Sequence, residues 1–513
     1  MKNRIVLFCL LITFFSGLWA SEKQTGAMNL EDAKPAVKTG WAFIEMGINL
    51  AVTAVFYWIK YTQFLEDWQF TLTWKDQQRK FFTSEGLRMD SNRLLTNVVH
   101  AWAGAFYYSC ARTNGLSPFV SLLFSAGGSL IWEYVAEWRE ISSINDHIFT
   151  IAGGPASGEP LFQIASHFRS RPGLANRIAC LLVNPVLGIN DFIDGKSRPA
   201  RVPSRGASDF RLSLGGKQGP ASPADNASAH AAFDLDLRLV TLPGYGRPGS
   251  GSGYSRLPLD NEYRISFSFN DSLVEEISAR TSCVLAGWWW RRVSASENGA
   301  LRGSESWLGW VMAWDFFLKK TVAAYDGDEL GMTDPWLERE QPTRYTDKYS
   351  TIHLIGPDYN LTMYSGALTA RLGLQATLDF SMIHSLAYNT YSADHDVWGV
   401  KTTLHNWGYY YSMGYSLEGR FDVRTQGLRL EAGIEYQRCA SIQGLDRFQD
   451  DIRDDSRLSD TRFAYNAALS VAVPRSPFFF SFNLEGIDRS GRFHEVSVKN
   501  HELRFFYRLG VSF

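Results

Sequence analysis

Residues 503–513 read LRFFYRLGVSF, and their period of two decides the fold. The positions between the apolar residues are polar or small, apart from Phe506. The apolar row consists of Leu503, Phe505, Tyr507, Leu509, Val511 and Phe513. Because successive side chains of a β-strand point to opposite faces, one face of this segment is apolar throughout. We expect a strand with lipid on one side and a polar interior on the other.

The same alternation recurs through the C-terminal part of the chain, in residues 233–239, 263–270, 368–381 and 428–437. The longer runs extend over about nine residues or more, as a tilted membrane strand requires. Strands of a soluble sandwich also alternate, but they are usually shorter. Lipid offers no hydrogen-bond partners, so a sheet there must have no open edge. Residues 209–513 are therefore predicted to form an antiparallel transmembrane β-barrel of about 12 strands.

Residues 41–190 have a helical pattern instead. The expected helices cover residues 41–61, 92–112, 118–140 and 175–183. Ser142 or Ser143 should cap a further short helix, and Gly153-Gly154-Pro155 should bend or break it. Residues 191–208 carry Gly, Ser, Pro and Arg without periodicity and read as a linker. The fold class is therefore α+β, with an N-terminal helical domain followed by the barrel.

The first 20 residues have the pattern of a signal peptide. Lys2 and Arg4 precede an apolar stretch, residues 5–19, that is too short to span a membrane. Cleavage is expected after Ala20, and residues 21–40 read as a polar linker. The alternative is an uncleaved membrane anchor. No disulfide framework is indicated by the widely spaced cysteines of the mature chain, Cys110, Cys180, Cys283 and Cys439.

Composition excludes several classes of function. The 51 Lys and Arg residues balance 53 Asp and Glu residues, giving a net charge of −2, so a nucleic-acid partner is not expected. A mean hydropathy of −0.18 argues against a polytopic helical membrane protein. No Walker loop, dinucleotide fingerprint or HExxH zinc motif is present. The sequence leaves a cofactor and a small-molecule ligand undefined.

Polar stretches between the predicted strands read as loops, at residues 244–255, 325–348 and 443–460. The last is rich in Asp and Arg and is typical of a long extracellular loop. A calcium loop is the alternative, although the glycine and terminal glutamate of an EF-hand are absent. Six tryptophans are expected to form interfacial girdles, with packing in the barrel wall as the alternative: Trp288, Trp289, Trp290, Trp307, Trp310 and Trp314.

Polar residues spaced by four along the expected helices form a candidate site, because residues four apart share one face of a helix. One row leads through His100 to Arg112, and another leads from Ser121 to Glu133 and Glu137. The candidate catalytic residues are His100, Glu133, Glu137, Asp146 and Glu159. Carboxylates and an imidazole can hold a metal ion or transfer protons. The alternative is a structural polar network, whose members are paired where they are buried.

These residues also carry a resemblance to a known family. Asn97-x-x-His100, Gly104 and Arg112 look like the opening motif of a bacterial family called domain of unknown function 3943. The continuation is similar at Gly128-Ser129, Trp132-Glu133, Ser143-Ile144-Asn145-Asp146, Gly153-Gly154 and Gly158-Glu159. The resemblance covers residues 81–190 and implies a helical region joined to a C-terminal outer-membrane barrel, but no reaction. Ala101 and Pro155 depart from the family pattern.

The sequence predicts a location and leaves the function open. We expect the bacterial outer membrane, with a periplasmic helical domain that caps or plugs the barrel in an envelope structural or transport role. The expected partners are outer-membrane lipid and the barrel assembly machinery, because the strand ending at Phe513 resembles the assembly signal of such barrels. The alternative is an envelope- or lipid-directed enzyme with its site in the helical domain. A passive pore is the third possibility, since inward charges allow a wet lumen.

Overall fold

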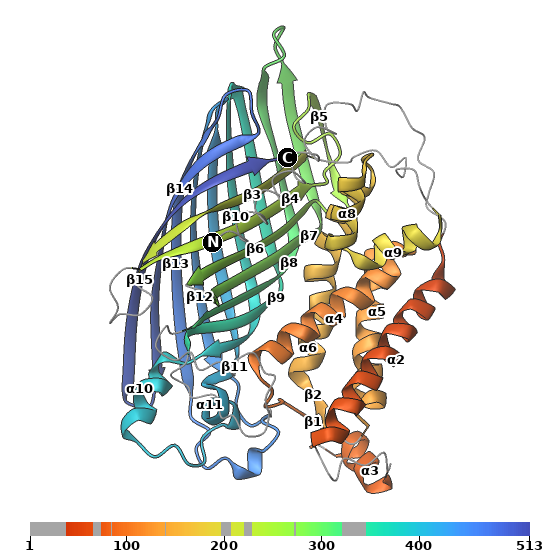
Figure 1. The fold of residues 1–513 in the computed structure, drawn as a ribbon, viewed down its shortest axis with the longest axis vertical. Coiled ribbons are helices and arrows are strands. Elements are labelled where there is room, and N and C mark those ends of the chain that lie inside the picture. Colours follow the sequence, from red (N-terminus) through yellow and green to blue (C-terminus); the bar gives the residue numbers. More distant parts are fainter. Residues whose placement is uncertain are drawn as a thin grey trace.

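The computed structural model describes residues 37–64, 73–83, 85–138, 140–195, 207–219, 228–270, 273–320 and 345–513. These residues form a helical layer that lies beside a β-barrel (Figure 1). The predicted signal peptide, residues 1–20, lies outside the described residues, as does most of the predicted loop 325–348.

The helical layer follows the predicted helices closely. Its helices are α2 (Thr39–Phe64), α3 (Trp74–Phe82), α4 (Leu94–Thr113), α5 (Pro118–Ile131), α6 (Ile144–Gly153), α7 (Glu159–Arg169), α8 (Leu174–Val183) and α9 (Pro185–Ile193). The π-helical turns are η1 (Trp132–Ala136), which extends α5, and η2 (Gly154–Gly158), which joins α6 to α7. Two short strands, β1 (Leu87–Arg88) and β2 (Ser142–Ser143), pair in parallel. As predicted, Ser143 caps α6, its hydroxyl accepting from the backbone N–H of Asp146.

The break predicted at Gly153-Gly154-Pro155 is wrong, because the chain stays helical through η2. Both glycines have helical backbone angles and serve close packing instead of a turn. A Cβ on Gly153 would lie 2.7 Å from the Ala101 backbone, and one on Gly154 would lie 2.2 Å from the Ser125 hydroxyl. The π-helical turn accommodates the proline, which has no N–H to donate.

The barrel strands alternate in direction around a closed ring. They are β3 (Ala207–Gly219), β4 (Ser228–Val240), β6 (Asp260–Asn270), β7 (Leu273–Ala295), β8 (Leu301–Lys320), β9 (Tyr345–Gly366), β10 (Leu368–His384), β11 (Tyr409–Arg424), β12 (Leu428–Ser441), β13 (Leu458–Ala472), β14 (Phe478–Phe493) and β15 (Val496–Ser512). Each pairs with its neighbours in this order, and β15 returns to β3. A closed antiparallel barrel of 12 strands is therefore confirmed. An additional strand, β5 (Gly249–Ser255), pairs with the upper part of β7 inside a predicted loop.

The terminal strand has the predicted phase. Phe505 and Tyr507 point outward and are 50% and 51% exposed, whereas Arg504 and Arg508 are buried in the lumen. Other strands repeat this pattern, with exposed apolar side chains that include Leu374, Leu378, Leu417, Ile434 and Phe482. An apolar exterior around a charged interior is the reverse of a soluble barrel and is the pattern of a transmembrane one.

The two ends of the barrel differ. The first residue of β3 and the last residue of β15 lie at one end, here called the terminal end, together with short turns such as residues 425–427 and one longer connection, residues 241–259, which holds β5. The opposite end, here called the loop end, carries the long connections between β10 and β11 and between β12 and β13 (Figure 1). These connections hold α10 (Leu386–Asp394), α11 (Thr402–Trp407) and the 3-10 turn η5 (Gln449–Asp451).

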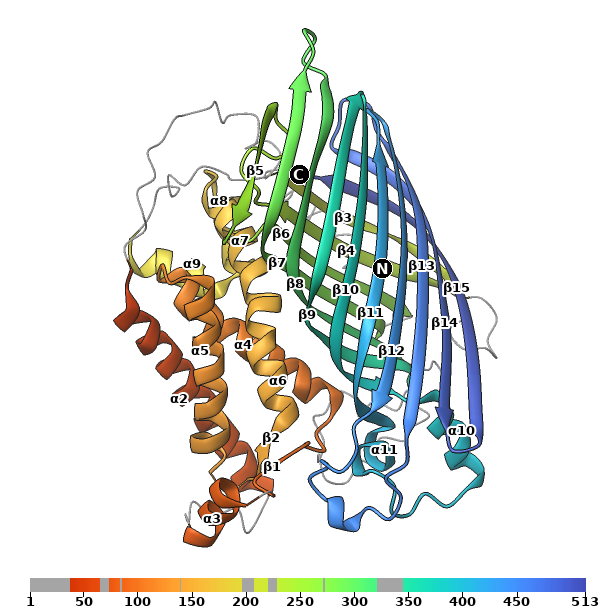
Figure 2. The ribbon, with the colours of Figure 1, turned by 180° about the vertical axis from the view of Figure 1, so that it is seen from behind.

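The helical layer packs on the outer wall of the barrel, as the views from the front and from behind both show (Figures 1 and 2). Phe149 of α6 meets Phe380 of β10, with 5.7 Å between the ring centroids. The Ser157 hydroxyl of η2 lies 2.7 Å from the hydroxyl of Thr281 on β7. The described helices bury their small and aromatic side chains against outward-facing strand residues. They therefore do not form the expected plug or cap.

The six tryptophans divide into groups, and Trp289 is partly buried against the cluster that contains Trp307. Trp288, Trp290 and Trp310 are 45–48% exposed on the outer surface, as a girdle requires. Trp314 is also on the outside, but Trp102 of α4 covers it. Trp307 is fully buried, donates to the Asp358 carboxylate at 2.9 Å and lies beneath the Arg371 guanidinium. The girdle prediction is therefore wrong for Trp307, because it fills the interior of the barrel.

Candidate functional site

Three of the predicted site residues meet at the beginning of α6. The His100 Nε2 atom lies 3.5 Å from the Asp146 carboxylate. The Glu133 carboxylate accepts from the backbone N–H of Ser143 at 2.8 Å, one residue before α6. Asp146 and Glu133 are 1% exposed, and the side chain of His100 is 14% exposed. Helical spacing and the serine cap thus bring an imidazole and two carboxylates to one place.

Other members of this cluster were not predicted as site residues. The Asn145 amide donates to Asn97 at 2.8 Å and to the Asp146 carboxylate at 2.9 Å. The Asn145 side-chain oxygen accepts from the backbone N–H of Asp90 at 2.8 Å. Asn97 and Asn145 both belong to the motif that resembles a known family, and this was the available signal. We call Asp90, Asn97, His100, Glu133, Asn145 and Asp146 the joint cluster.

Glu137 lies at the edge of the joint cluster. Its carboxylate accepts from the Trp132 indole N–H at 2.9 Å, and its backbone carbonyl accepts from the Lys80 ammonium at 2.7 Å. The Lys80 ammonium also donates to the backbone carbonyl of Glu133. Lys80 therefore satisfies the end of the π-helical turn η1, where carbonyl groups lack helical partners.

Glu159 lies elsewhere, in a separate buried ion pair. Its carboxylate accepts from Arg112 Nε at 2.7 Å and from Arg112 Nη2 at 2.9 Å. The hydroxyl of Tyr108 donates to it at 2.7 Å, and the amide of Gln163 donates at 2.6 Å. Glu159 is fully buried. A bidentate pair with every partner in place is typical of a structural contact.

The joint cluster connects the helical layer to the loop end of the barrel. Arg447, from the β12–β13 connection, lies 3.2 Å from the Asp90 carboxylate and 3.1 Å from the Glu140 carboxylate. Backbone bonds join Met89 to Leu445 and Arg447. Burial raises the pKa of Asp90 to about 6, although Arg447 acts in the opposite direction. Arg447, which belongs to the loop predicted at residues 443–460, therefore places a positive charge against the carboxylates of the helical layer.

The arrangement of the joint cluster limits its chemistry. His100 faces Asp146 at 3.5 Å without a hydrogen bond between them, and the buried Glu133 Oε1 atom has no hydrogen-bond partner. In the part of the chain that the structure describes, His100, Glu133 and Asp146 do not bring their donor atoms together as a metal-binding set. Most other polar atoms of the cluster are paired with one another or with the barrel. These contacts favour a structural network over an open active site.

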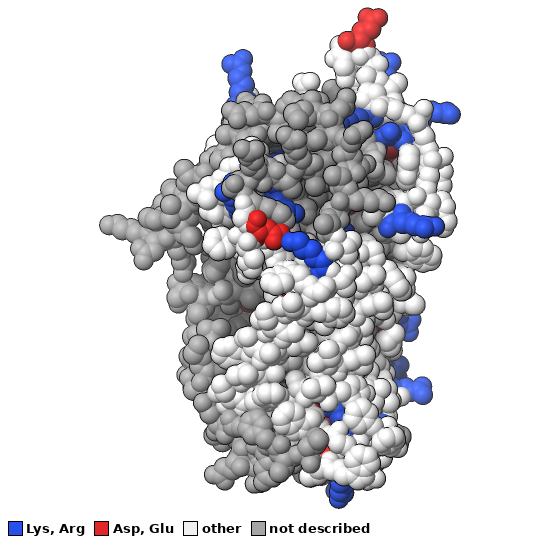
Figure 3. All heavy atoms as spheres, turned by 90° about the vertical axis from the view of Figure 1, so that its right-hand side faces the viewer, with Lys and Arg blue, Asp and Glu red and all other residues white. Residues whose placement is uncertain are grey.

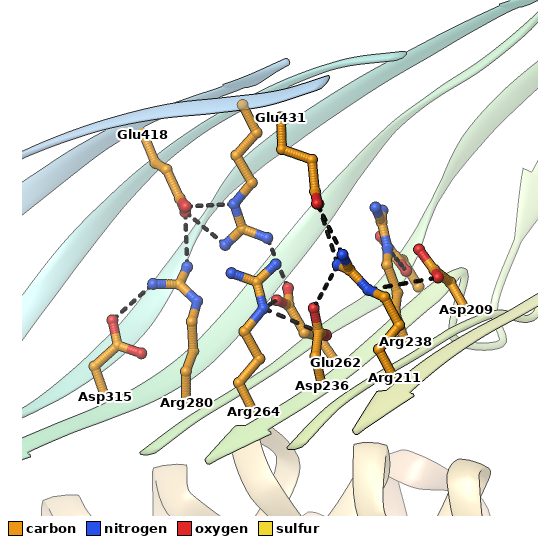
Figure 4. Close-up of polar contacts among 12 residues, drawn as sticks. Asp209, Arg211, Asp236, Arg238, Glu262, Arg264, Arg280, Asp315, Glu418 and Glu431 are labelled. Atoms are coloured by element: carbon orange, nitrogen blue, oxygen red, sulfur yellow. Dashed lines mark hydrogen bonds and ion pairs between the residues drawn. The ribbon is translucent and has the colours of Figure 1, made fainter. Parts of the chain in front are cut away.

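The second polar region is the lumen of the barrel. Ion pairs connect strands on opposite sides of the ring, so they cross the lumen (Figure 4). Arg211 of β3 binds Glu431 of β12 at 2.8 Å, and Arg280 of β7 binds Glu418 of β11 at 2.7 Å. Further pairs across the ring are Arg424–Asp209, Arg371–Asp260, Lys319–Glu502, Arg489–Asp347 and Arg504–Glu276.

These pairs extend from the terminal end to the loop end. Asp209 lies near the start of β3, whereas Lys319 lies near the end of β8, at the opposite end of the barrel. Near the terminal end, the Tyr245 hydroxyl lies 2.8 Å from the Thr362 hydroxyl, and the backbone N–H of Gly246 donates to Glu305 at 2.9 Å. Cavities of about 130 and 370 Å³ remain between the pairs. The lumen is therefore divided and narrow.

Comparison with solved structures finds outer-membrane proteins at low similarity. OmpT, an outer-membrane protein of Vibrio cholerae, is 8% identical over 61% of this chain and 99% of its own, with a TM-score of 0.21. Pseudomonas putida OprB is 9% identical over 63% and 97%, with a TM-score of 0.17. Pseudomonas aeruginosa OccK10 (OpdN) is 10% identical over 60% and 99%, with a TM-score of 0.18. Such low scores carry no argument about function.

No curated protein matches the chain significantly. Residues 86–186 match the model of the family described as "Domain of unknown function (DUF3943)". The matched range includes the entire joint cluster, from Asp90 to Asp146, and also Glu159. The resemblance predicted from the sequence motifs is confirmed: the helical layer carries a DUF3943 region, and a closed 12-strand barrel follows it.

Proposed function

We propose that this chain is a bacterial outer-membrane protein whose barrel is a closed scaffold and not a diffusion pore. The observation that carries the proposal is the set of ion pairs that cross the lumen along its whole length. Each pair holds two opposite walls together, and the pairs occupy space that a porin leaves to water. The scaffold holds the helical layer at a fixed place in the membrane, and the barrel assembly machinery inserts it through β15.

The closed lumen is tested by conductance. Purified protein in planar bilayers is expected to show no steady open channel. The triple variant Arg211→Ala/Arg424→Ala/Arg429→Ala leaves Glu431 and Asp209 without their cationic partners. These carboxylates then repel one another and attract water, so a steady cation-selective conductance should appear, with some loss of stability.

Arg302→Ala is the matched control, because Arg302 is an exposed arginine beside the β7–β8 turn. This variant should give no steady conductance across the bilayer. A wide, steady conductance in the unmodified protein would contradict the scaffold role and would favour a passive pore.

We further propose that the helical layer lies in the same membrane and not in the periplasm. In the described residues, α2 and the α5–η1 helix are long and apolar enough to cross a membrane. Their exposed side chains include Phe43, Ile48, Phe56, Phe119, Leu123 and Val135. The described part of the face turned away from the barrel carries few charges except near its edges and its upper part (Figure 3). This apolar surface continues that of the barrel wall.

The depth of the helical layer is tested with spin labels at matched positions. Phe56, Phe119 and Trp398 are equally exposed, at 70%, 70% and 71%. Labels at Phe56→Cys and Phe119→Cys are expected to be accessible to oxygen and protected from a water-soluble nickel chelate, as in lipid. The label at Trp398→Cys, in the loop between α10 and α11, should show the opposite. If all three positions respond like the loop position, the helical layer is in water.

The long connections of outer-membrane barrels face the cell exterior, and their short turns face the periplasm. This rule would place the joint cluster at the outer side of the membrane.

We propose that the cluster fixes the helical layer to the loop end through Arg447. Proton transfer by His100, Glu133 and Asp146 is the second candidate function, and the partial exposure of His100 favours it.

A further inference from the structure

We propose that Asp315, His353 and Glu435 bind a divalent transition-metal ion of the zinc class inside the barrel. The three residues come from β8, β9 and β12, so the site would connect neighbouring strands to the opposite wall. One ligand atom of each residue lies within 4.8 Å of the others. Among the described residues this is the group of His, Cys, Asp and Glu side chains that converges in this way.

The histidine is already oriented for a metal ion. His353 Nδ1 lies 2.7 Å from the Asp379 carboxylate and 3.0 Å from the Thr377 hydroxyl. Thr377 and Ser416 hold Asp379 in turn. Nδ1 therefore has its partner, and Nε2 faces Asp315 at 3.1 Å. Around bound zinc, a histidine is usually held by a carboxylate through one nitrogen and ligates the ion through the other, so an ion here would replace the contact between Nε2 and Asp315.

Each of the two carboxylates has at least one oxygen without a partner. Asp315 is 6% exposed, and its buried Oδ1 atom has no hydrogen-bond partner. Its other oxygen accepts from Arg280 at 2.7 Å, a contact drawn in Figure 4, and lies 3.1 Å from His353 Nε2. Within the described residues, the Glu435 carboxylate forms neither a hydrogen bond nor an ion pair. Two carboxylates this close repel each other unless a cation or a proton lies between them.

Arg280 provides only part of the positive charge that Asp315 and Glu435 need. Its guanidinium is shared between Asp315 and Glu418, at 2.7 Å each, and it leaves Asp315 Oδ1 and Glu435 unpaired. A divalent ion would neutralise both. One imidazole nitrogen and two carboxylate oxygens suit zinc, whose ligands lie about 2.0–2.2 Å from the ion. Glu435 is only partly buried, so its side chain can close the remaining gap.

Three protein ligands would leave one coordination position open. Asp315 and Glu435 both line the cavity of about 370 Å³, and that position would face it. Water or a small anion can therefore complete the coordination. The inference goes beyond the scaffold role, and it does not depend on where the helical layer lies.

Metal binding is tested on the full-length protein in detergent, stripped with a chelator and then titrated with Zn²⁺ alone. Calorimetry and elemental analysis are expected to give one ion per chain, and Co²⁺ should give the absorption of a nitrogen–oxygen site. Glu435→Gln should abolish this binding while the heat-modifiable folded band persists, because Glu435 has no partner to lose. Asp379→Asn, which loosens the histidine, should weaken the affinity about 10–100-fold.

Glu485→Gln is the matched control, since Glu485 is another partly buried carboxylate that lines the same cavity. It should bind Zn²⁺ like the unmodified protein. Equal loss in both variants would mean that the ion is held by the general negative charge of the lumen. Absence of stoichiometric binding, or binding that survives both Glu435→Gln and His353→Gln, would overturn the proposal. In that case His353 bridges Asp379 and Asp315 as a cation. Neither result alters the conductance test of the scaffold role.

Discussion

Truncation after Phe506 is expected to abolish folding of the barrel. β15 closes the ring by pairing with β3, from Phe505 opposite Gln218 to Ser512 opposite Arg211. The truncation removes most of this pairing and also exposes part of β14. Each backbone group left without a partner in lipid costs several kcal/mol, so no stable open form is available. The heat-modifiable band should disappear, and the protein should be degraded in cells.

The matched control keeps the length and changes only the outward side chains. Phe505→Leu/Tyr507→Leu retains an apolar outer face and every backbone pair, so it should fold and fractionate with outer-membrane markers. A truncated chain that still gives a heat-modifiable, membrane-inserted form would contradict closure through β15. Loss of folding in the leucine variant would instead point to recognition of the aromatic side chains.

The barrel was predictable because two environments act on every strand. Lipid selects side chains such as Leu374 and Ile434, and the lumen selects those between them, such as Glu431. The alternation along each strand therefore identifies the side chains that point into the lumen. It does not show which inward residues meet, since that depends on shear and on strands far apart in sequence. Asp315, His353 and Glu435 were missed as a metal-binding group for this reason.

The helices were predictable, but their position was not. Glu45 and Asn49 interrupt the apolar surface of α2. In the structure, the Asn114 amide donates to one oxygen of the Glu45 carboxylate at 2.9 Å, so Glu45 faces another helix of the layer. An apolar helix face has the same appearance in a sequence whether it meets lipid, a core or a barrel wall.

The joint cluster shows where spacing rules succeed and where they end. Helical spacing and the cap at Ser143 placed His100, Glu133 and Asp146 together. Glu159 was assigned to the same site because a break was expected at Gly153-Gly154-Pro155. Since the helix continues, Glu159 faces Arg112 instead. Arg447 enters the cluster from far along the chain, and no local pattern predicts such a contact.

Glu159→Gln is expected to cause the largest loss of stability in the helical layer. The substitution leaves the Arg112 guanidinium, whose side chain is 11% exposed, without its counter-charge. Breaking a buried pair in this way costs about 3–5 kcal/mol. Arg112→Met/Glu159→Gln removes both charges and should recover much of the loss, because an apolar side chain then replaces the cation. Denaturant unfolding in detergent, followed by the helical circular dichroism signal, measures the difference.

The control is a second cation–carboxylate pair in the same layer, in a more exposed environment. Lys38 and Asp194 are 2.9 Å apart, and their side chains are 44% and 24% exposed. Solvent screens such a pair, so Asp194→Asn should change stability by less than about 1 kcal/mol. Equal effects of the two substitutions would mean that the Glu159 pair is not desolvated. A double variant less stable than Glu159→Gln alone would show that the contacts of Arg112 with the Leu116 carbonyl and the Phe162 ring outweigh the relief of removing the unpaired charge. A catalytic Glu159 predicts a different result, because its replacement would remove an activity and leave unfolding unchanged.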